Sequence, residues 1–291
     1  MNPVIELRRM KPQLGTFVEI SVGGIRRERL LQAVSRAFDT GALIQRLMSF
    51  HDADSETNSL NREARRAPVQ VHAYTYQVLK MAKRIWSATG GLFDCTVAPT
   101  LMEWGYLPRH LSAAGNYGGD SGDIELQPDR RVRFRRPICI DLGGVAKGFS
   151  VDQMVKSLKN DGVPYGCVNA GGDLRFFGNR EYPLQIRLPG APHKFMCVGR
   201  FRETAVATSA PYFSAKQFRK RRVSPLIHPA SGKPMIGRRS VSLFAPDCLI
   251  ADALTKAVIL DPDFPQPVLR QFQASAVVLS QSGGVLSLNR L

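Results

Sequence analysis

The segment IDLGGVAKGFSVD at residues 140–152 constrains the fold most, because glycines join an apolar strand to an amphipathic helix there. Glycine lets backbone N–H groups approach a ligand, and the first turn of a helix favours anions. With Lys147 in that turn, the amides and the ammonium would point the same way, which suits a phosphate. Close helix packing at Gly143, Gly144 and Gly148 explains the glycines equally well. The spacing matches neither the Walker loop nor G-x-G-x-x-G, so two common nucleotide motifs are excluded.

Strand and helix patterns follow one another without regular alternation. GTFVEISVGG alternates as a strand does, and apolar residues at helical spacing predict helices over 26–48, 74–89, 145–158 and 249–259. Residues 124–141 are expected to form an arginine-rich hairpin with Phe134 facing inward, and residues 167–178 one buried strand that is interrupted by a glycine pair. Further strands are expected at 183–188, 197–208 and 240–246, and two short strands at the end of the chain. We therefore expect an α+β fold with mixed or antiparallel sheets and packed helices, not a doubly wound α/β fold.

The 291 residues contain no internal repeat, low-complexity tract or convincing linker. This predicts a single unit over residues 1–291, built either as one body or as two interleaved lobes. Residues 108–124 are rich in Gly, Ser, Asn and Asp, and we expect them to form a surface loop or an insertion.

The chain is strongly basic, with 40 Lys and Arg against 24 Asp and Glu, so its partner is expected to be acidic: a nucleotide, nucleic acid, anionic lipid or acidic protein. The five cysteines are widely spaced and contain no C-x-x-C pair, which favours buried reduced thiols over disulfides or a zinc site. No segment reads as a signal peptide or a membrane span, so a cytoplasmic location is expected for the sequence as written.

Six motifs occur in a fixed order: FDCTVAP at 93–99, IDLGGVAKGFSVD at 140–152, CVNAGGDLRFFG at 167–178, ATSAPYF at 207–213, HPASGKP at 228–234 and ADALTKA at 251–257. In this order and at these spacings the chain resembles the ApbE family of FAD:protein FMN transferases, from about Arg9 to Asp261. The resemblance implies a flavin cleft between two halves of the fold. It also implies an activity that binds FAD, moves its FMN part onto a Ser or Thr hydroxyl of an acceptor protein and releases AMP.

The resemblance also assigns roles to individual residues. Those implied to contact FAD are Asp94, Thr96, Gly143, Gly144, Lys147, Gly148, Asn169, Gly171, Gly172, Asp173 and Ser209. Phosphoryl transfer needs charge neutralisation at the pyrophosphate and a base for the acceptor hydroxyl. As alternatives, Asp94 and Thr96 could cap a turn, and Asp173 could satisfy local backbone.

The late helix departs from the family pattern. The resemblance implies that Mg²⁺ is held by the carbonyl of Ala146, by Asp252 and by a threonine four residues later; here that residue is Lys256, and Thr255 stands one place earlier. Thr255 could still coordinate, since residues three and four apart share a helix face. Alternatively, Lys256 pairs with Asp252 and supplies a fixed positive charge in place of the ion.

A second departure affects the expected base. Where the family commonly has H-x-x-D-P-x-x-G, this chain has PLIHPASG, so Pro225 replaces the histidine and His228 replaces the aspartate. Either His228 takes over the catalytic role beside Asp252, or it is a turn residue and transfer is reduced or absent. The alternative functions are then a relative that stores or hydrolyses FAD, or, on charge alone, a nucleic-acid-binding module.

The segment KQFRKRRV at 216–223 concentrates five positive charges. It could receive an acidic partner or the AMP phosphate, although a solvated loop explains it more simply. Nucleic-acid binding would call for more aromatic residues than Phe218 alone, so no nucleic-acid partner is expected. Family relatives are often exported and lipid-anchored, but the sequence as written shows neither signal, which implies a cytoplasmic acceptor protein.

Overall fold

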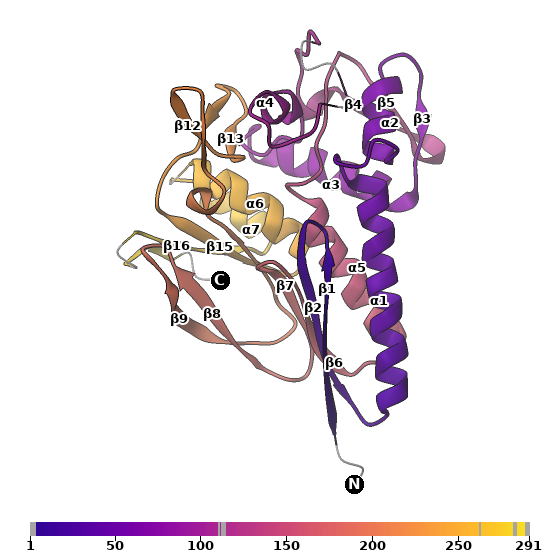
Figure 1. Cartoon of the computed structure of the whole chain (residues 1–291), viewed down its shortest axis with the longest axis vertical. Helices are drawn as coiled ribbons and strands as arrows, with labels where there is room; N and C mark the ends of the chain where they lie inside the picture. The colour runs from indigo at the N-terminus through magenta and orange to yellow at the C-terminus, as the bar shows by residue number, and fades with distance from the viewer. Residues whose placement is uncertain (1–3, 110, 112–114, 262, 282–283, 289–291) are drawn as a thin grey trace.

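The computed structural model describes residues 4–109, 111, 115–261, 263–281 and 284–288. Within these residues an eight-stranded antiparallel sheet forms the frame (Figure 1). Its strands, in spatial order, are β1 (Ile5–Gln13), β2 (Thr16–Gly24), β6 (Tyr165–Ala170), β7 (Asp173–Gly178), β10 (Ala205–Ser209), β15 (Ser240–Ala245), β16 (Ser275–Leu279) and β17 (Val285–Leu288).

Three long helices cover one face of this sheet. They are α1 (Arg27–Met48), α5 (Ala146–Asn160) and α6 (Cys248–Leu260), and α5 contacts both of the others. In α1 the apolar residues recur every three or four positions, so Leu30, Val34 and Phe38 share one buried stripe. This stripe packs on Ile20 and Val22 of β2, and the burial of these side chains holds helix and sheet together.

A hairpin of β8 (Tyr182–Leu188) and β9 (Ala191–Phe201) covers part of the opposite face. Leu184 and Ile186 pack there against Phe244 of β15. The neighbouring β15 residue Leu243 points the other way, into the core shared with α6. Every residue of β15 is buried as a result, which explains why this strand is apolar or small throughout.

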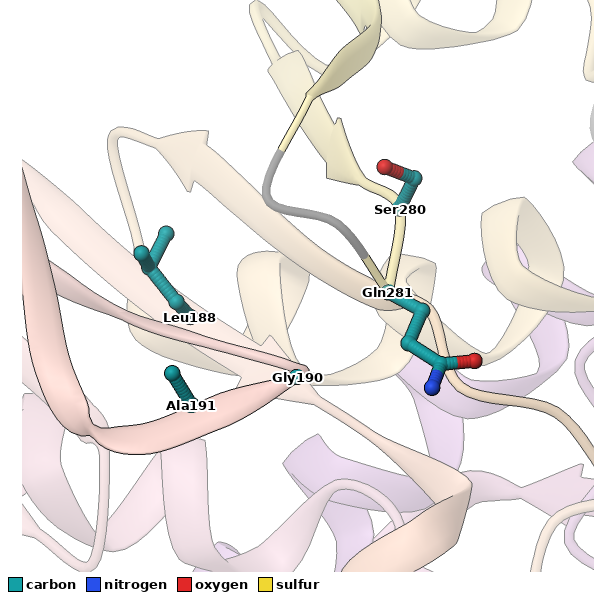
Figure 2. Close-up of a pocket in the computed structure, with 5 residues that line it drawn as sticks. All are labelled: Leu188, Gly190, Ala191, Ser280 and Gln281. Carbon is teal, nitrogen blue, oxygen red and sulfur yellow. The ribbon is translucent and has the colours of Figure 1, made fainter.

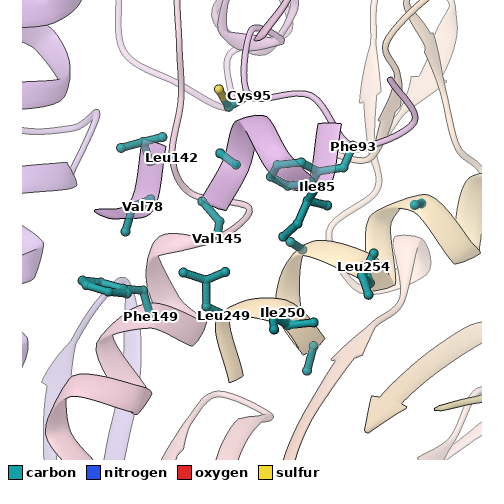
Figure 3. Packing of buried hydrophobic residues seen from close by; sticks show 14 of the residues in the cluster. Val78, Ile85, Phe93, Cys95, Leu142, Val145, Phe149, Leu249, Ile250 and Leu254 are labelled. Atoms are coloured by element: carbon teal, nitrogen blue, oxygen red, sulfur yellow. The ribbon is translucent and has the colours of Figure 1, made fainter. Parts of the chain in front are cut away.

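The remaining elements complete the end of the molecule that carries the N-terminus of α5 and the C-terminal half of α6. Its helices are α2 (Glu56–Glu63), α3 (Ala73–Ala88), α4 (Ala98–Glu103), α7 (Gln266–Gln271) and the short turns η1 (Ser121–Asp123), η2 (Pro128–Arg130) and η3 (Pro211–Phe213). Its strands form a sheet of β3 (Val69–Gln70), β5 (Arg131–Phe134) and β4 (Ile124–Gln127), and hairpins of β11 (Lys216–Phe218) with β12 (Arg221–Val223) and β13 (Ile227–His228) with β14 (Lys233–Pro234). Figure 3 shows their common core, where Val78 and Ile85 of α3 meet Phe149 of α5 and Leu249 of α6.

The predicted α+β class is confirmed, as are the four predicted helices to within two residues at each end. The arginine-rich hairpin is β4 and β5, and Phe134 faces inward as expected, with 1% of its surface exposed. These features depend on local periodicity, which the sequence displays directly. The predicted domain organisation stays a prediction.

Other expectations were wrong. Residues 167–178 form parts of two antiparallel strands, because Gly171 (φ 66°) and Gly172 (φ 104°) reverse the chain between β6 and β7. The strand expected over 197–208 is likewise broken between β9 and β10, where Glu203 has a φ of 46°. Strand β1 and helices α2, α4 and α7 were not predicted, since β1 is a mostly exposed edge strand and the three helices are short.

Three further segments differ in detail from expectation. The basic segment at 216–223 is a hairpin rather than a loop. Of the cysteines, Cys95, Cys139 and Cys248 are buried, but Cys197 is exposed. In the stretch 108–124, the described residues before Ser121 carry no helix or strand, while Ser121, Asp123 and Ile124 are buried; residues 110 and 112–114 lie outside the described residues.

Candidate functional site

A cavity of about 930 Å³ opens where the N-terminus of α5, the turn between β6 and β7, the end of β10, helix α6 and the β8–β9 hairpin meet. Its volume falls in the upper part of the range of about 300–1,000 Å³ found for ligand pockets. Eight of the predicted site residues line it: Gly143, Gly144, Lys147, Asn169, Gly171, Gly172, Asp173 and Ser209. Segments separated by more than 100 residues of sequence therefore converge here.

Four charged side chains meet at the floor of this cavity. Lys147 pairs with Asp173, and its Nζ lies 3.5 Å from Asp252 Oδ2. Lys256, one turn after Asp252 on α6, pairs with the other carboxylate oxygen, and its Nζ donates to the Asp252 carbonyl oxygen at 2.8 Å. Asp252 is fully buried, whereas the two lysines and Asp173 line the cavity. Two ammonium groups and two carboxylates therefore balance in charge.

The environment determines which of these groups ionise. Burial, and then the charge of Asp252, raise the pKa of Asp173 above its ordinary value. Burial also opposes ionisation of Asp252, but the ammonium groups of Lys147 and Lys256 outweigh it and hold the pKa of Asp252 below its ordinary value. For Lys147, burial lowers the pKa and the two carboxylates raise it, with a net upward shift. Lys147 and Asp252 are consequently charged at neutral pH.

The glycines serve different purposes. A Cβ on Gly148 would lie 2.3 Å from the Cys248 carbonyl oxygen, so this glycine allows the close packing of α5 on α6. Gly148 is also absent from the cavity lining, while its N–H donates to Asp252 Oδ2 at 3.1 Å. Gly144 and Gly172 have no atom closer than 3.7 Å to the corresponding position, so their backbone is open to the cavity. Both explanations of the glycine-rich segment thus hold, at different residues.

Asp94 and Thr96 lie outside the lining of the large cavity. Asp94 Oδ1 accepts hydrogen bonds from the Thr96 N–H and hydroxyl, both at 2.8 Å, and from the Ser121 hydroxyl at 2.7 Å. These bonds tie residues 94–96 to η1 and form a local turn of the kind that a carboxylate stabilises. Asp94 also lines an adjoining cavity of about 80 Å³. A contact with FAD stays a prediction for this pair.

Two of the three residues predicted to hold Mg²⁺, Asp252 and Thr255, are engaged with other groups. Both carboxylate oxygens of Asp252 face lysine ammonium groups. The Thr255 hydroxyl donates to the Asp252 carbonyl oxygen and bonds to Ser209 Oγ, each at 2.7 Å. An ammonium and a divalent ion 4 Å apart repel by about 8 kcal/mol at an effective dielectric constant near 20. These groups, as arranged, do not fit a divalent ion at Asp252, although Ala146 lines a neighbouring cavity of about 360 Å³.

The structure separates Pro225 from His228. Pro225 lines both the 930 Å³ cavity and the small adjoining one, together with Lys256. His228 lies in β13 opposite Lys233 and lines none of the cavities described here; its Nδ1 is buried and has no hydrogen-bond partner among the described residues. Its predicted catalytic role is not supported by this placement and stays a prediction.

Sequence reasoning did not single out Asp141, although it is the second residue of the motif at 140–152. Asp141 lines the 930, 360 and 80 Å³ cavities alike, and its carboxylate accepts the Gly143 N–H at 3.1 Å. Burial raises the pKa of Asp141 above its ordinary value. A carboxylate two residues before a glycine pair was the available signal, but the sequence does not show that three cavities meet at this residue.

Aromatic side chains at the cavity were also missed. The guanidinium carbon of Arg187 lies 5.6 Å from the Phe195 ring centre and 5.8 Å from that of Phe213, and these two rings are 52% and 57% exposed. All three residues line the cavity. Exposed aromatic rings beside a cation suit a planar ligand, but isolated Phe residues on separate segments carry no recognisable sequence pattern.

A different cavity, of about 590 Å³, lies between the β8–β9 turn and the end of β16 (Figure 2). It is lined by Leu188, Gly190, Ala191, Ser280 and Gln281, none of which carries a charge. It therefore offers nothing to neutralise an anionic ligand. The charged, glycine-lined cavity at α5 and α6 is therefore the stronger candidate for the functional site.

Comparison with known proteins identifies the family. The profile of the ApbE family matches residues 14–277, so the chain belongs to the ApbE family. Among curated relatives, the FAD:protein FMN transferase of Klebsiella pneumoniae (strain 342) is 25% identical over 298 residues, covering 93% of this chain and 83% of the relative. That of Vibrio cholerae serotype O1 is 26% identical over 279 residues, covering 89% and 82%.

Solved structures share the fold over nearly the whole chain. The ApbE protein of Thermotoga maritima superposes with a TM-score of 0.81 at 25% identity, covering 97% of this chain and 96% of that one. The flavinyl transferase ApbE of Pseudomonas stutzeri gives 0.81 at 20% identity, covering 98% and 94%. Within the described part of the chain, no helix has both the length and the apolar character needed to cross a bilayer.

Proposed function

We propose that this protein is an FAD:protein FMN transferase that binds FAD in the 930 Å³ cavity and moves its FMN part onto a Ser or Thr hydroxyl of an acceptor protein. The observation that carries the proposal is the pair of ammonium groups, Lys147 and Lys256, on a glycine-lined cavity of a chain from the ApbE family. The names of relatives at 25–26% identity support FAD as the substrate.

In this proposal the pyrophosphate of FAD lies beside the two lysines. The open backbone at Gly144 and Gly172 leaves room for the phosphate oxygens, as glycine does in other phosphate sites, and Gly143 and Gly171 line the same cavity. Asn169, Asp173 and Ser209, which are also predicted to contact FAD, line the same cavity. The Asn169 side chain also accepts the Gly172 N–H at 2.9 Å, which holds the turn between β6 and β7 in shape.

The transfer step exchanges one phosphorus–oxygen bond for another. The acceptor hydroxyl oxygen bonds to the phosphorus on the FMN side, and the bond from that phosphorus to the bridging oxygen breaks. AMP leaves with the electron pair, and its new negative charge is stabilised by the ammonium groups. The hydroxyl proton passes to a base, and we assign this role to Asp141, because it is a carboxylate on the cavity wall whose pKa is raised.

Asp141 is preferred to His228 on position, since only Asp141 lines the cavity. Asp252 then acts by holding the two lysines in place, rather than by contacting FAD. Mg²⁺ has no part in the proposed step, because the side-chain oxygen atoms predicted to hold it, those of Asp252 and Thr255, are engaged with the lysines and with Ser209. The acceptor protein and a cytoplasmic location stay predictions.

The test is covalent flavinylation of an acceptor. A candidate acceptor is co-expressed with the protein, and denaturing gels are read for flavin fluorescence, followed by mass spectrometry of the acceptor. An FMN-sized mass increase on a Ser or Thr is expected, and it should be lost in Lys147→Met. The matched control is Lys156→Met, the same change at an exposed position of α5. Release of FMN and AMP with an unmodified acceptor would instead indicate an FAD-hydrolysing relative.

A further inference from the structure

Lys256 differs from an ordinary surface lysine of a helix. Its side chain is only 19% exposed and pairs with Asp252, which is 0% exposed. Burying a carboxylate is costly unless it is paired and hydrogen-bonded, so the position of Lys256 is strongly determined. In an exposed ion pair on a helix surface, by contrast, the long side chains are not held in a single position.

The pair is part of a larger network that leaves Asp252 fully engaged. Asp252 Oδ2 accepts the Gly148 N–H at 3.1 Å and lies 3.5 Å from Lys147 Nζ, while Oδ1 pairs with Lys256. Lys147 is held from its other side by Asp173. Helix α5, strand β7 and helix α6 thereby fix two ammonium groups relative to each other.

One donor of Lys256 remains for a ligand. A lysine ammonium has three donors, and the contacts to the carboxylate and carbonyl oxygens of Asp252 use two of them. No other acceptor contacts this ammonium among the residues that the structure describes, and Lys256 lines the large cavity. The third donor is thus positioned to meet an anionic oxygen in the cavity.

We propose that the ammonium groups of Lys256 and Lys147 contact the pyrophosphate of FAD in the place of a divalent cation, so that cleavage of FAD by this protein needs no metal ion. The inference rests on the proposed function for its substrate. Its physical basis is separate: the carboxylate that a metal would use is already neutralised by covalently attached cations, which a chelator cannot remove.

Direct metal binding is the first test, and it does not depend on activity. The protein, with and without FAD, is titrated with Mn²⁺ and followed by electron paramagnetic resonance, with free FAD as the reference. No bound Mn²⁺ beyond that held by free FAD is expected in the wild type. In Lys256→Thr, where Asp252 loses one cation, added Mn²⁺ binding is expected. Stoichiometric Mn²⁺ on the wild-type protein would overturn the inference.

The second test compares the rate of FAD consumption in excess chelator and in Mg²⁺. The two wild-type rates should agree within about twofold, and Lys256→Met should lower the rate in chelator by about 10²- to 10³-fold, as loss of one stabilising charge does at other active sites. Lys256→Arg, which keeps the charge, should retain far more activity than Lys256→Met, and Lys156→Met should match the wild type. A wild-type rate that collapses in chelator and returns with Mg²⁺ would refute metal independence.

The two proposals fail in different ways. If neither the wild type nor any variant consumes FAD or modifies an acceptor, the proposed transferase function is wrong, while the Mn²⁺ titration still decides whether Lys256 occupies the cation position. If FMN transfer occurs but requires Mg²⁺, the function stands and the inference about Lys256 is wrong.

Discussion

Replacing Gly148 by alanine should destabilise the fold, because α6 packs directly against the backbone of α5 at this residue. The added Cβ would lie 2.3 Å from the Cys248 carbonyl oxygen, 2.6 Å from its carbonyl carbon and 2.9 Å from Asp252 Cβ. Two of these atoms belong to the backbone of α6, so no side-chain rotation can relieve the overlap. The helices must separate by about 1 Å before ordinary van der Waals contact is restored.

The expected cost follows from overpacking of a close-packed interface, which is about 1–3 kcal/mol. For a domain of this size, each kcal/mol lowers the melting temperature by about 2–4 °C, so Gly148→Ala should melt about 2–12 °C below the wild type. The separation also lengthens the bond from the Gly148 N–H to Asp252, now 3.1 Å, and moves Lys147. Affinity for FAD should therefore fall as well.

Differential scanning fluorimetry measures the first effect, and quenching of flavin fluorescence measures the second. Gly144→Ala is the matched control, because a Cβ there meets nothing closer than 3.7 Å, from Lys256 Cε and Phe93 Cε2. Its melting temperature should equal or slightly exceed that of the wild type. If both alanine variants melt together with the wild type, the close approach of α5 and α6 is not as described and the packing explanation of Gly148 is refuted.

Three further predictions concern the cavity and the thiols. Pro225→His places an imidazole on the wall of the cavity that Asp141 also lines. In initial-rate assays, FMN transfer by this variant should be at least about 10-fold faster than by Pro225→Ala. Equal rates would show that a base at this position does not limit the reaction. Asp141→Asn should lower transfer by about 10²-fold with little change in FAD affinity. The wild-type rate should fall on acidification through the raised pKa of Asp141, above the ordinary value near 4, because only the ionised carboxylate accepts a proton; a rate that stays flat down to pH 4 would contradict its role. A disulfide reagent should react first with exposed Cys197, because the thiolate is the reactive form and burial raises the pKa of Cys95 to about 12. Cys197→Ser should therefore remove the fast phase of the reaction with the reagent. A fast phase that persists in this variant would show that another thiol is accessible.

Local patterns were sufficient for much of the fold. The stripe of Leu30, Val34 and Phe38 predicts α1, and the alternation in GTFVEISVGG predicts β2, because each pattern matches the period of one element. The strand predictions were wrong where one or two residues with positive φ reverse or break the strand. Gly171 and Gly172 look like an interruption of a single strand, and only the pairing of β6 with β7 shows them to be a turn.

The candidate site divides in the same way. Motif order, visible in the sequence, indicated the family and brought Lys147, Gly172 and Asp173 to attention as residues of one site. It could not indicate that Pro225 lines the cavity while His228 three residues later does not. The direction of a side chain in a short hairpin depends on the register of β13 with β14, which no local pattern records.

By itself, then, the sequence determined helices α1, α3, α5 and α6, the fold class and the set of motifs, since these depend on the spacing of neighbouring residues. Only the tertiary structure decided that Gly148 packs two helices, that Asp141 joins three cavities and that Lys256 neutralises Asp252 beside Lys147. Gly148 and Asp252 are 104 residues apart in the chain. Contacts over such separations depend on how whole elements pack, and the burial of Asp252 that gives Lys256 its importance exists only after α5, β7 and α6 have come together.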